Sequence, residues 1–351
     1  MSAVFCFRIK GDEKGLVGRE KGIGLGHANR CLALAREWES LTGEAAVFMI
    51  NSTKAALGWV EEKGYPFYLE DEVDRVIRET NPSVLFFDIN YLEPIMVEPW
   101  RNKALICNVA PRGEIKYANL LNYLDTAADV DEARACVNDA KILTGPDYAV
   151  IGDAFRAIRA RIDLGERPWK PRAITVAMGG SDPWNFTTLA VSSLKTIPLE
   201  FDVRVVIGPY FSFEEELRAA IDSSGRVVEV LHNPNCFAEL VAESTLCLLA
   251  GGITMFEALS VGVPSWNLCP TRFHLERCRE LETGGLIFDS TLDRNYKLRN
   301  WACGIETFLS DESKIQTIRS KAIQTVDGRG ATRIIRDVIE RRSAQAISVT
   351  F

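Results

Sequence analysis

Short apolar runs alternate with amphipathic segments along the whole chain. In the first half, the apolar runs lie at residues 3–9, 45–50, 84–89, 104–109 and 118–122. In the second half, they recur at residues 173–180, 202–208, 227–231, 244–252 and 263–268. Apolar runs of this length separated by helical patterns are typical of βαβ units and of a mostly parallel sheet. The pattern therefore predicts an α/β fold built from two successive sheets, each covered by helices.

The alternation is interrupted by the segment RIDLGERPWKPR at residues 161–172, which is charged and contains two prolines. Such a segment is typical of a linker. We therefore predict an N-terminal domain over residues 1–165 and a C-terminal domain over residues 166–330, both Rossmann-like. Parallel sheets that face each other across a cleft would bind a ligand at the carboxyl ends of their strands. The final segment, 331–351, has the spacing of an amphipathic helix, and we expect it to pack back on the N-terminal domain.

Composition narrows the class of protein. The 351 residues are 47% hydrophobic and 25% charged, as in soluble globular proteins, and the net charge of −7 argues against nucleic acid polymers as partners. Nine cysteines without a CxxC pair are typical of reduced thiols in a cytoplasmic protein. No apolar stretch is long enough for stable membrane insertion. The three histidines have no zinc-type spacing, so we expect neither a metal nor a cofactor.

The segment GIGLGHANRCLALA at residues 22–35 is a candidate ligand-binding turn. Alternating glycines, among them Gly24 and Gly26, precede His27 and the apolar face of a predicted helix. His27 and Arg30 would then lie at the positive end of that helix, where an anion is favoured and a histidine can transfer a proton. A dinucleotide site would need glycine in place of His27, and no Lys-Ser/Thr pair marks a P-loop. A glycine-rich turn without any ligand is the alternative.

Two glycine pairs follow predicted strands in the second half. In VAMGGSDPWNFT, Gly180 and Ser181 lead into a helix whose N–H groups would bind a phosphate, or which Ser181 or Asp182 simply caps. In LLAGGITMFEALSVGVP, Gly251 and Gly252 precede another predicted helix. Thr254 lies within reach of a phosphate there, and the Glu257 carboxylate suits a ribose diol, unless Glu257 is only a solvated helix residue.

Together these three motifs resemble the UDP-sugar hydrolases of the pseudaminic acid pathway and the related spore-coat polysaccharide proteins. Those are GT-B proteins, similar to the lipid-linked GlcNAc transferase of murein synthesis. The resemblance covers most of the chain in the right order. It includes LTGPDYAVIGDAFRAIR at residues 143–159 and VLFFDINY at residues 84–91, whose aspartate is Asp88.

The resemblance implies that the C-terminal domain binds UDP. Gly252 and Thr254 would lie at the diphosphate, with Gly180, Ser181 and Gly251 beside it, and Glu257 at the ribose. The N-terminal domain would bind the sugar, and His27 would act on the attacking water. The anomeric C–O bond would then break with inversion, releasing UDP and a free sugar. For the sugar, the expected contacts are Gly24, Gly26, Arg30, Asp88 and His274.

The chain departs from the family pattern in three places. NLCPTRFHLERC at residues 267–278 replaces the usual Asn-Gln pair and brings in His274, which is a sugar contact or a surface helix residue. CNVAPRG at residues 107–113 lacks the frequent acidic residues. The segment at residues 10–22 is longer than the corresponding segment of the family. It is interpreted either as a flap over the site or as a solvated loop. A different sugar or acceptor would follow from these differences.

Three functions therefore compete. The first is hydrolysis of a UDP-linked sugar in surface-glycan or nonulosonic-acid-type biosynthesis. The second is glycosyl transfer from the same donor to an acceptor, which shares the fold and the nucleotide site. The third is a non-catalytic nucleotide-sugar binder, which would keep the region from Gly252 to Glu257 but would not need His27.

Overall fold

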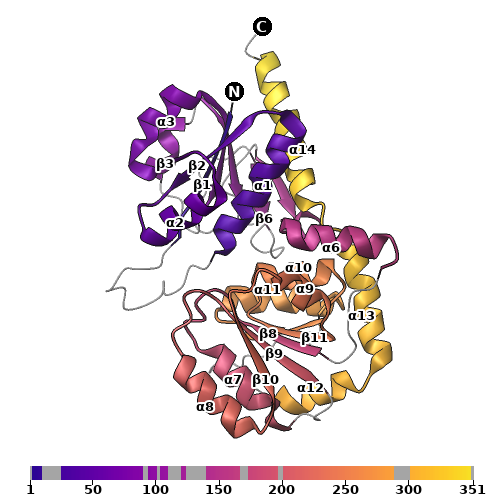
Figure 1. The fold of residues 1–351 in the computed structure, drawn as a ribbon. Coiled ribbons are helices and arrows are strands. Elements are labelled where there is room, and N and C mark those ends of the chain that lie inside the picture. Colours follow the sequence, from indigo (N-terminus) through magenta and orange to yellow (C-terminus); the bar gives the residue numbers. More distant parts are fainter. Residues whose placement is uncertain are drawn as a thin grey trace. The chain divides into compact units, whose positions relative to one another are not determined.

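The computed structural model describes residues 2–9, 25–89, 94–100, 103–109, 120–123, 140–166, 173–196, 201–287 and 301–348. By its contacts the chain divides into two compact units (Figure 1). The first comprises Met1–Val150 together with Arg329–Phe351, and the second comprises Ile151–Gly328. Of the predicted motif segments, Gly24 and all of residues 10–22 lie outside the described residues.

The first unit contains a seven-stranded sheet with the order β3-β2-β1-β4-β5-β6-β7. Every neighbouring pair in it is parallel. The strand order reverses between β1 and β4, which creates a topological switch point at the carboxyl ends of these two strands. The strands are β1 (Ser2–Phe7), β2 (Ala45–Ile50), β3 (Phe67–Leu69), β4 (Pro82–Asp88), β5 (Leu105–Val109), β6 (Leu120–Tyr123) and β7 (Lys141–Thr144).

Both faces of this sheet are buried, as a parallel sheet requires. Because successive side chains of a strand point to opposite faces, Phe5 and Phe7 pack into one core and Val4 and Cys6 into the other. The first core is closed by α1, α2 and α14, and the second by α3, α4 and the turn after α4. The helices are α1 (Gly26–Thr42), α2 (Lys54–Lys63), α3 (Val73–Thr80), α4 (Pro94–Val97) and α14 (Gly330–Ser348), with 3-10 turns at Glu70–Glu72, Glu98–Trp100 and Pro146–Tyr148.

The last helix, α14, belongs to the first unit although it follows the second unit in sequence. It packs along α1. The Thr332 hydroxyl donates to Glu37 at 2.7 Å, and Arg342 donates to Glu44 at 2.6 Å. The Arg342 guanidinium also lies 4.9 Å from the centre of the Trp38 ring. Apolar burial and these polar contacts together hold α14 against α1.

The second unit contains a five-stranded parallel sheet with the order β10-β9-β8-β11-β12. Its switch point lies between β8 and β11. The strands are β8 (Ala173–Ala177), β9 (Asp202–Ile207), β10 (Val228–His232), β11 (Leu246–Leu249) and β12 (Ser265–Asn267). The helices are α6 (Asp153–Asp163), α7 (Phe186–Ser193), α8 (Glu214–Ser224), α9 (Phe237–Ala242), α10 (Ile253–Ser260), α11 (Arg272–Thr283), α12 (Trp301–Leu309) and α13 (Glu312–Thr325), with a 3-10 turn at Leu194–Thr196.

The chain enters the second unit between Val150 and Ile151, whereas the sequence pattern placed the division after residue 165. The reason is α6, which packs on α9 and α10 and so belongs to the second unit. The charged segment 161–172 begins inside this helix, because α6 continues to Asp163.

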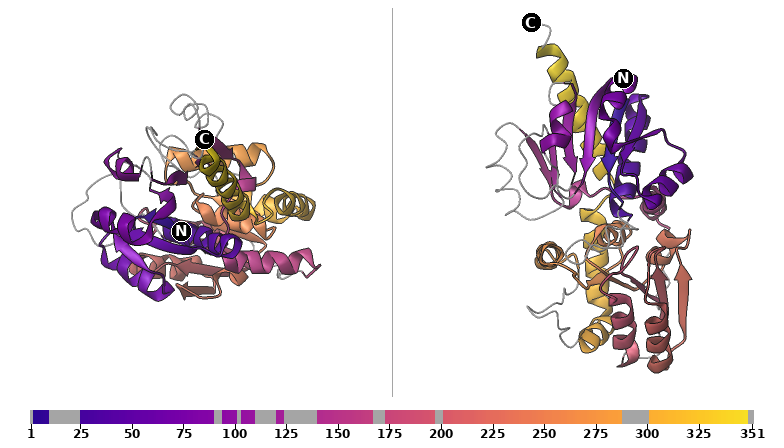
Figure 2. Two further views of the ribbon diagram at one scale, coloured as in Figure 1. Left: turned by 90° about the horizontal axis from the view of Figure 1, so that it is seen from above. Right: turned by 90° about the vertical axis from the view of Figure 1, so that its left-hand side faces the viewer.

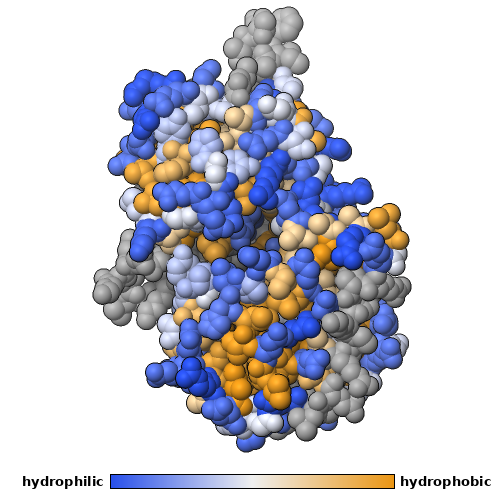
Figure 3. Space-filling model, in the orientation of Figure 1, coloured by the Kyte–Doolittle hydropathy of each residue, from blue (hydrophilic) through white to orange (hydrophobic). Residues whose placement is uncertain are grey.

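Helices flank the sheet of each unit in the two further views (Figure 2). In the space-filling view, an apolar area lies on the visible face of the second unit (Figure 3). β10 is an edge strand of that unit with half-buried and exposed residues, and Val227 just before it is 95% exposed. Among the helices in the described part of the chain, none has the length and apolar character needed to cross a bilayer.

Candidate functional site

A histidine, an arginine and an aspartate meet at the switch point of the first sheet. His27 and Arg30 lie in the first two turns of α1, and Asp88 is the last residue of β4, next to Phe7 of β1. His27 Nδ1 lies 2.6 Å from Asp88 Oδ1. Arg30 donates through Nε to Asp88 Oδ2 at 2.6 Å and through Nη2 to Asp88 Oδ1 at 2.5 Å. One aspartate thus holds both side chains.

The charges in this cluster fix which ring nitrogen of His27 is available. The Asp88 side chain is fully buried, whereas that of His27 is 16% exposed. Burial raises the pKa of the Asp88 carboxyl, but Arg30 and His27 outweigh it and hold the pKa below its ordinary value. An ionised carboxylate only accepts hydrogen bonds, so His27 donates to it through Nδ1–H. In the neutral ring, Nε2 then carries the lone pair, which is the arrangement of a general base.

The predicted sugar contacts of the first unit take different places in this cluster. Both oxygens of Asp88 are engaged by His27 and Arg30, and Asp88 is buried, so we interpret it as the group that orients His27. Arg30 is also buried and neutralises Asp88. Gly26 is the first residue of α1, whose N-terminus has no side-chain cap. Gly24 lies outside the described residues.

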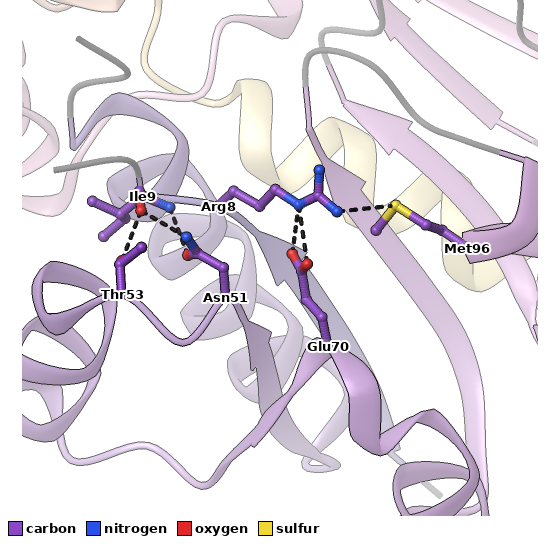
Figure 4. A network of polar contacts seen from close by, with 6 residues as sticks. All are labelled: Arg8, Ile9, Asn51, Thr53, Glu70 and Met96. Atoms are coloured by element: carbon purple, nitrogen blue, oxygen red, sulfur yellow. Dashed lines mark hydrogen bonds and ion pairs between the residues drawn. The ribbon is translucent and has the colours of Figure 1, made fainter. Parts of the chain in front are cut away.

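A second polar network at the same edge of the first sheet is drawn in Figure 4. Arg8 donates through Nε to both oxygens of Glu70, at 2.8 and 3.0 Å. Asn51 exchanges two hydrogen bonds with the backbone of Ile9, and the Thr53 hydroxyl donates to the Ile9 carbonyl at 2.8 Å. The network fixes the chain where it leaves β1. Sequence reasoning missed it, although Arg8, Asn51 and Glu70 each directly follow the last residue of a strand.

In the second unit, the loop after β8 leads into α7, and a side chain of this loop already binds the first N–H groups of that helix. The Asp182 carboxylate accepts from the backbone N–H groups of Phe186, at 2.9 Å, and Thr187, at 2.7 Å. Burial raises the pKa of Asp182, against the effect of these bonds. The N-terminus of α7 is thus capped by an acid, which is the alternative to a phosphate site there. Gly180 accepts a bond from the Tyr210 N–H at 3.0 Å, and Ser181 is partly exposed beside it.

The loop after β11 differs from the loop after β8, because the helix that follows it, α10, begins after a glycine. Gly252 is the N-cap of α10 and has no side chain with which to cap it, and a Cβ added at Gly252 would have no heavy atom within 4 Å. Gly251 has φ of +68°, a conformation that glycine adopts at no steric cost. A Cβ at Gly251 would lie 3.0 Å from Cys278 Sγ and 3.3 Å from Cys269 Sγ. The backbone therefore approaches α11 closely while the N-terminus of α10 stays open, which suits an anion.

Glu257 lies on the second turn of α10. Its carboxylate accepts hydrogen bonds from the backbone of Gly152 and from the side chain of Thr254. Burial raises the pKa of Glu257 to about 7, and the two hydrogen bonds act in the opposite direction. A carboxyl group whose pKa is raised by burial at the carboxyl edge of a parallel sheet is a candidate functional group. The sequence had singled out Glu257 and Thr254 as candidates, whereas it gave no sign of the contact from Gly152.

His274 lies in the first turn of α11, close to the same loop. Its Nδ1 is 2.6 Å from the hydroxyl of Thr271, which also caps α11. A Cβ at Gly251 would lie 3.5 Å from the Cβ of His274. The loop after β11 and the start of α11 are therefore neighbours, and His274 is partly exposed beside the glycine pair. Within the described residues, no group of three or more His, Cys, Asp or Glu side chains is arranged to hold a metal ion.

Comparison with protein families finds no family model that matches the chain. The chain is 26% identical over 252 residues to an uncharacterized protein of Methanocaldococcus jannaschii, covering 69% of this chain and 52% of that protein. It thus spans about half the length of this relative. It is also 23% identical over 346 residues to the spore coat polysaccharide biosynthesis protein SpsG of Bacillus subtilis, covering 92% of this chain and 97% of SpsG.

Solved structures resemble the chain over nearly its full length. MurG of Acinetobacter baumannii matches with a TM-score of 0.65 at 13% identity, covering 97% of this chain and 100% of MurG. Anabaena Alr3699/HepE in complex with UDP matches with a TM-score of 0.63 at 14% identity, covering 98% of this chain and 100% of HepE. The chain has the GT-B fold. The fold class predicted from the sequence, two parallel-sheet α/β domains of GT-B type, is confirmed.

Proposed function

We propose that the protein hydrolyses a nucleotide-linked sugar, with UDP as the nucleotide, and releases UDP and the free sugar. The observation that carries the proposal is His27, whose Nδ1 is held by the buried Asp88 so that Nε2 is left as a base. The similarity to SpsG, a spore coat polysaccharide biosynthesis protein, supports a place in surface-polysaccharide biosynthesis. The GT-B neighbour in complex with UDP supports a UDP-sugar as the ligand.

In this proposal the first unit carries the base and the second unit binds the nucleotide. His27 Nε2 removes a proton from a water molecule as that water attacks the anomeric carbon. The bond between the anomeric carbon and the diphosphate oxygen breaks with inversion, and UDP leaves with the bonding electron pair. Asp88 stabilises the imidazolium that forms, and Arg30 keeps Asp88 ionised.

The open N-terminus of α10 is the proposed diphosphate site. Backbone N–H groups and the helix dipole at Gly251, Gly252 and Thr254 would stabilise the negative charge of the leaving UDP. Glu257 would accept from the ribose hydroxyls. Gly180 and Ser181 are proposed to lie beside the nucleotide on the β8 side. The N-terminus of α7 takes no part in this contact, because Asp182 already accepts from its N–H groups.

For the sugar, we propose contacts from Gly26 at the start of α1 and from His274 beside Gly251. Arg30 and Asp88 act on the sugar only through His27 in this proposal, because both are buried.

Glycosyl transfer is the second candidate function, supported by the structural similarity to a glycosyltransferase from Rickettsia africae, which has a TM-score of 0.61 at 11% identity and covers 96% of this chain. The same imidazole would then remove a proton from an acceptor hydroxyl instead of water. A non-catalytic binder is less favoured, because binding alone does not require a histidine oriented by a buried carboxylate.

The test is to incubate the protein with a panel of UDP-, CMP- and GDP-sugars without any acceptor and to follow the reaction by proton NMR. We expect free sugar to appear from a UDP-sugar, first as the anomer of inverted configuration. Turnover only after an acceptor is added would favour glycosyl transfer. Binding without turnover under all conditions would favour the non-catalytic binder.

UDP affinity is expected to depend on pH through Glu257. The pKa of Glu257 in the free protein is raised to about 7. Because the ribose hydroxyls donate to the ionised carboxylate, UDP should bind more tightly as the pH rises through 7. At pH 6 about one tenth of Glu257 is ionised, so the affinity for UDP should be about tenfold lower than with the carboxylate fully ionised. Isothermal titration calorimetry from pH 6 to 8 measures it.

The control is Glu257→Gln, which keeps the shape of the side chain and has no proton to lose. The pH dependence that remains in this variant comes from other groups, including the diphosphate itself. A pH profile that is identical in the wild type and in Glu257→Gln contradicts the proposed role of Glu257.

A further inference from the structure

Gly152 meets Glu257 at the point where the chain enters the second unit. The division between the units falls between Val150 and Ile151, and Gly152 is the N-cap of α6. Its backbone N–H donates to the Glu257 carboxylate. A Cβ built at Gly152 would lie 3.2 Å from Glu257 Oε1, a contact tighter than side chains usually make.

The backbone torsions at position 152 do not require a glycine. Gly152 has φ of −65° and ψ of 151°, an extended conformation that other residues adopt readily. A side chain at position 152 would instead crowd the Glu257 carboxylate, which lies close to the backbone there. The glycine therefore serves the contact with Glu257 rather than a special backbone conformation.

The donor is also held firmly relative to α10. Arg159 of α6 donates through Nη1 to the carbonyl of Ser260 at 3.1 Å and to the carbonyl of Val326 at 2.7 Å. Ser260 is the last residue of α10, the helix that carries Glu257. Phe155 and Ile158 of α6 are buried as well. These contacts leave the N–H of Gly152 little freedom to move away from the carboxylate.

We propose that the backbone N–H of Gly152 is a positioning group for ribose recognition: together with Thr254 it holds the Glu257 carboxylate so that its remaining lone pairs accept from the 2′- and 3′-hydroxyls of a ribonucleotide. The proposal rests on the proposed function, because it assumes a nucleotide at the N-terminus of α10. A carboxylate offers about four acceptor positions, so two protein donors leave room for two hydroxyls. The ligand class that follows is a ribonucleoside diphosphate, preferred over its 2′-deoxy form.

The test compares the affinities of UDP and 2′-deoxy-UDP by isothermal titration calorimetry in two variants at position 152. Gly152→Pro removes the N–H but fits the native φ, since proline fixes φ near −65°. Gly152→Ala keeps the N–H and adds only the close Cβ. We expect the wild type to prefer UDP about tenfold, as for a hydrogen bond to a charged group. Gly152→Pro should lose most of this preference, because UDP loses more affinity than 2′-deoxy-UDP, which keeps only the contact of its 3′-hydroxyl. Gly152→Ala, which keeps the N–H, should retain more of the preference than Gly152→Pro.

A measurement on the wild type keeps the test independent of whether Gly152→Pro folds. In protein labelled with ¹⁵N-glycine, the amide proton of Gly152 should shift when UDP is added and shift much less with 2′-deoxy-UDP. A full UDP preference in folded Gly152→Pro, or equal amide shifts with both nucleotides, overturns the inference. A wild type that binds neither nucleotide contradicts the proposed function instead.

Discussion

His27→Ala is expected to lower kcat on a UDP-sugar by about 10²–10⁴-fold, the usual contribution of a positioned general base. The affinity for UDP should stay within a few-fold of the wild type, because the proposed nucleotide contacts all come from the second unit. Steady-state kinetics and calorimetry with UDP measure the two quantities separately.

A matched control is His232→Ala. His232 ends β10 in the second unit, its side chain is 60% exposed, and its nearest acidic partner is Glu214 at 4.0 Å. This variant should keep both turnover and UDP affinity. Turnover by His27→Ala that equals the wild type would rule out the base role, and a loss of UDP affinity in His27→Ala would place the nucleotide elsewhere.

Asp88→Asn is expected to damage both turnover and stability. An amide has one acceptor oxygen, whereas His27 and Arg30 together donate to both oxygens of Asp88. Either the imidazole loses the bond that sets its tautomer or Arg30 loses an acceptor. We expect kcat to fall by about 10²–10⁴-fold, as when the aspartate of a histidine-aspartate pair is neutralised. Leaving a buried guanidinium without its counter-charge should cost about 3–5 kcal/mol of unfolding free energy.

The free energy of unfolding is expected to depend on pH through Asp88, and the direction follows from its pKa. The pKa of Asp88 in the folded protein is held below its ordinary value. Its contribution to stability is therefore present above about pH 4 and is lost as the pH falls through the folded-state pKa. Asp88→Asn should lack this contribution to acid unfolding, which urea denaturation at several pH values would reveal.

Glu70→Gln is the matched control for Asp88→Asn. It neutralises the other arginine-carboxylate pair at the same edge of the sheet, Arg8 with Glu70, where the side chains are 31% and 21% exposed. A pair with this much exposure contributes at most about 1 kcal/mol. Equal losses of unfolding free energy in Asp88→Asn and Glu70→Gln would contradict the claim that Asp88 stabilises the fold as the buried counter-charge of Arg30.

The sequence predicted the architecture well because a parallel α/β sheet has a strong pattern. All five strands of the second sheet coincide with predicted apolar runs. In the first unit the short strands β3 and β7 were not predicted, since three or four residues such as Phe67–Leu69 carry too little periodicity. The division between the units was misplaced for a different reason: prolines and charges mark a surface segment, but packing decides to which unit α6 belongs.

At the candidate site, the sequence singled out candidate residues but did not predict what they contact. His27 and Asp88 are 61 positions apart, and their contact follows from the adjacency of β1 and β4, which no local pattern encodes. The two glycine pairs looked alike in sequence. Asp182 caps the helix after the first pair, whereas the N-cap of the helix after the second pair is Gly252, which has no side chain. The bond from Gly152 to Glu257 joins segments far apart in the chain, so it also needed the structure.

The most direct test of the central claim is a reaction in H₂¹⁸O with a UDP-sugar that the panel identifies as a substrate. If His27 activates water to attack the anomeric carbon, mass spectrometry will find the ¹⁸O label in the released sugar and none in the released UDP. With His27→Ala under the same conditions, the labelled sugar should form about 10²–10⁴-fold more slowly. Label in the β-phosphate of UDP, or equal labelled sugar from His27→Ala, would contradict the account.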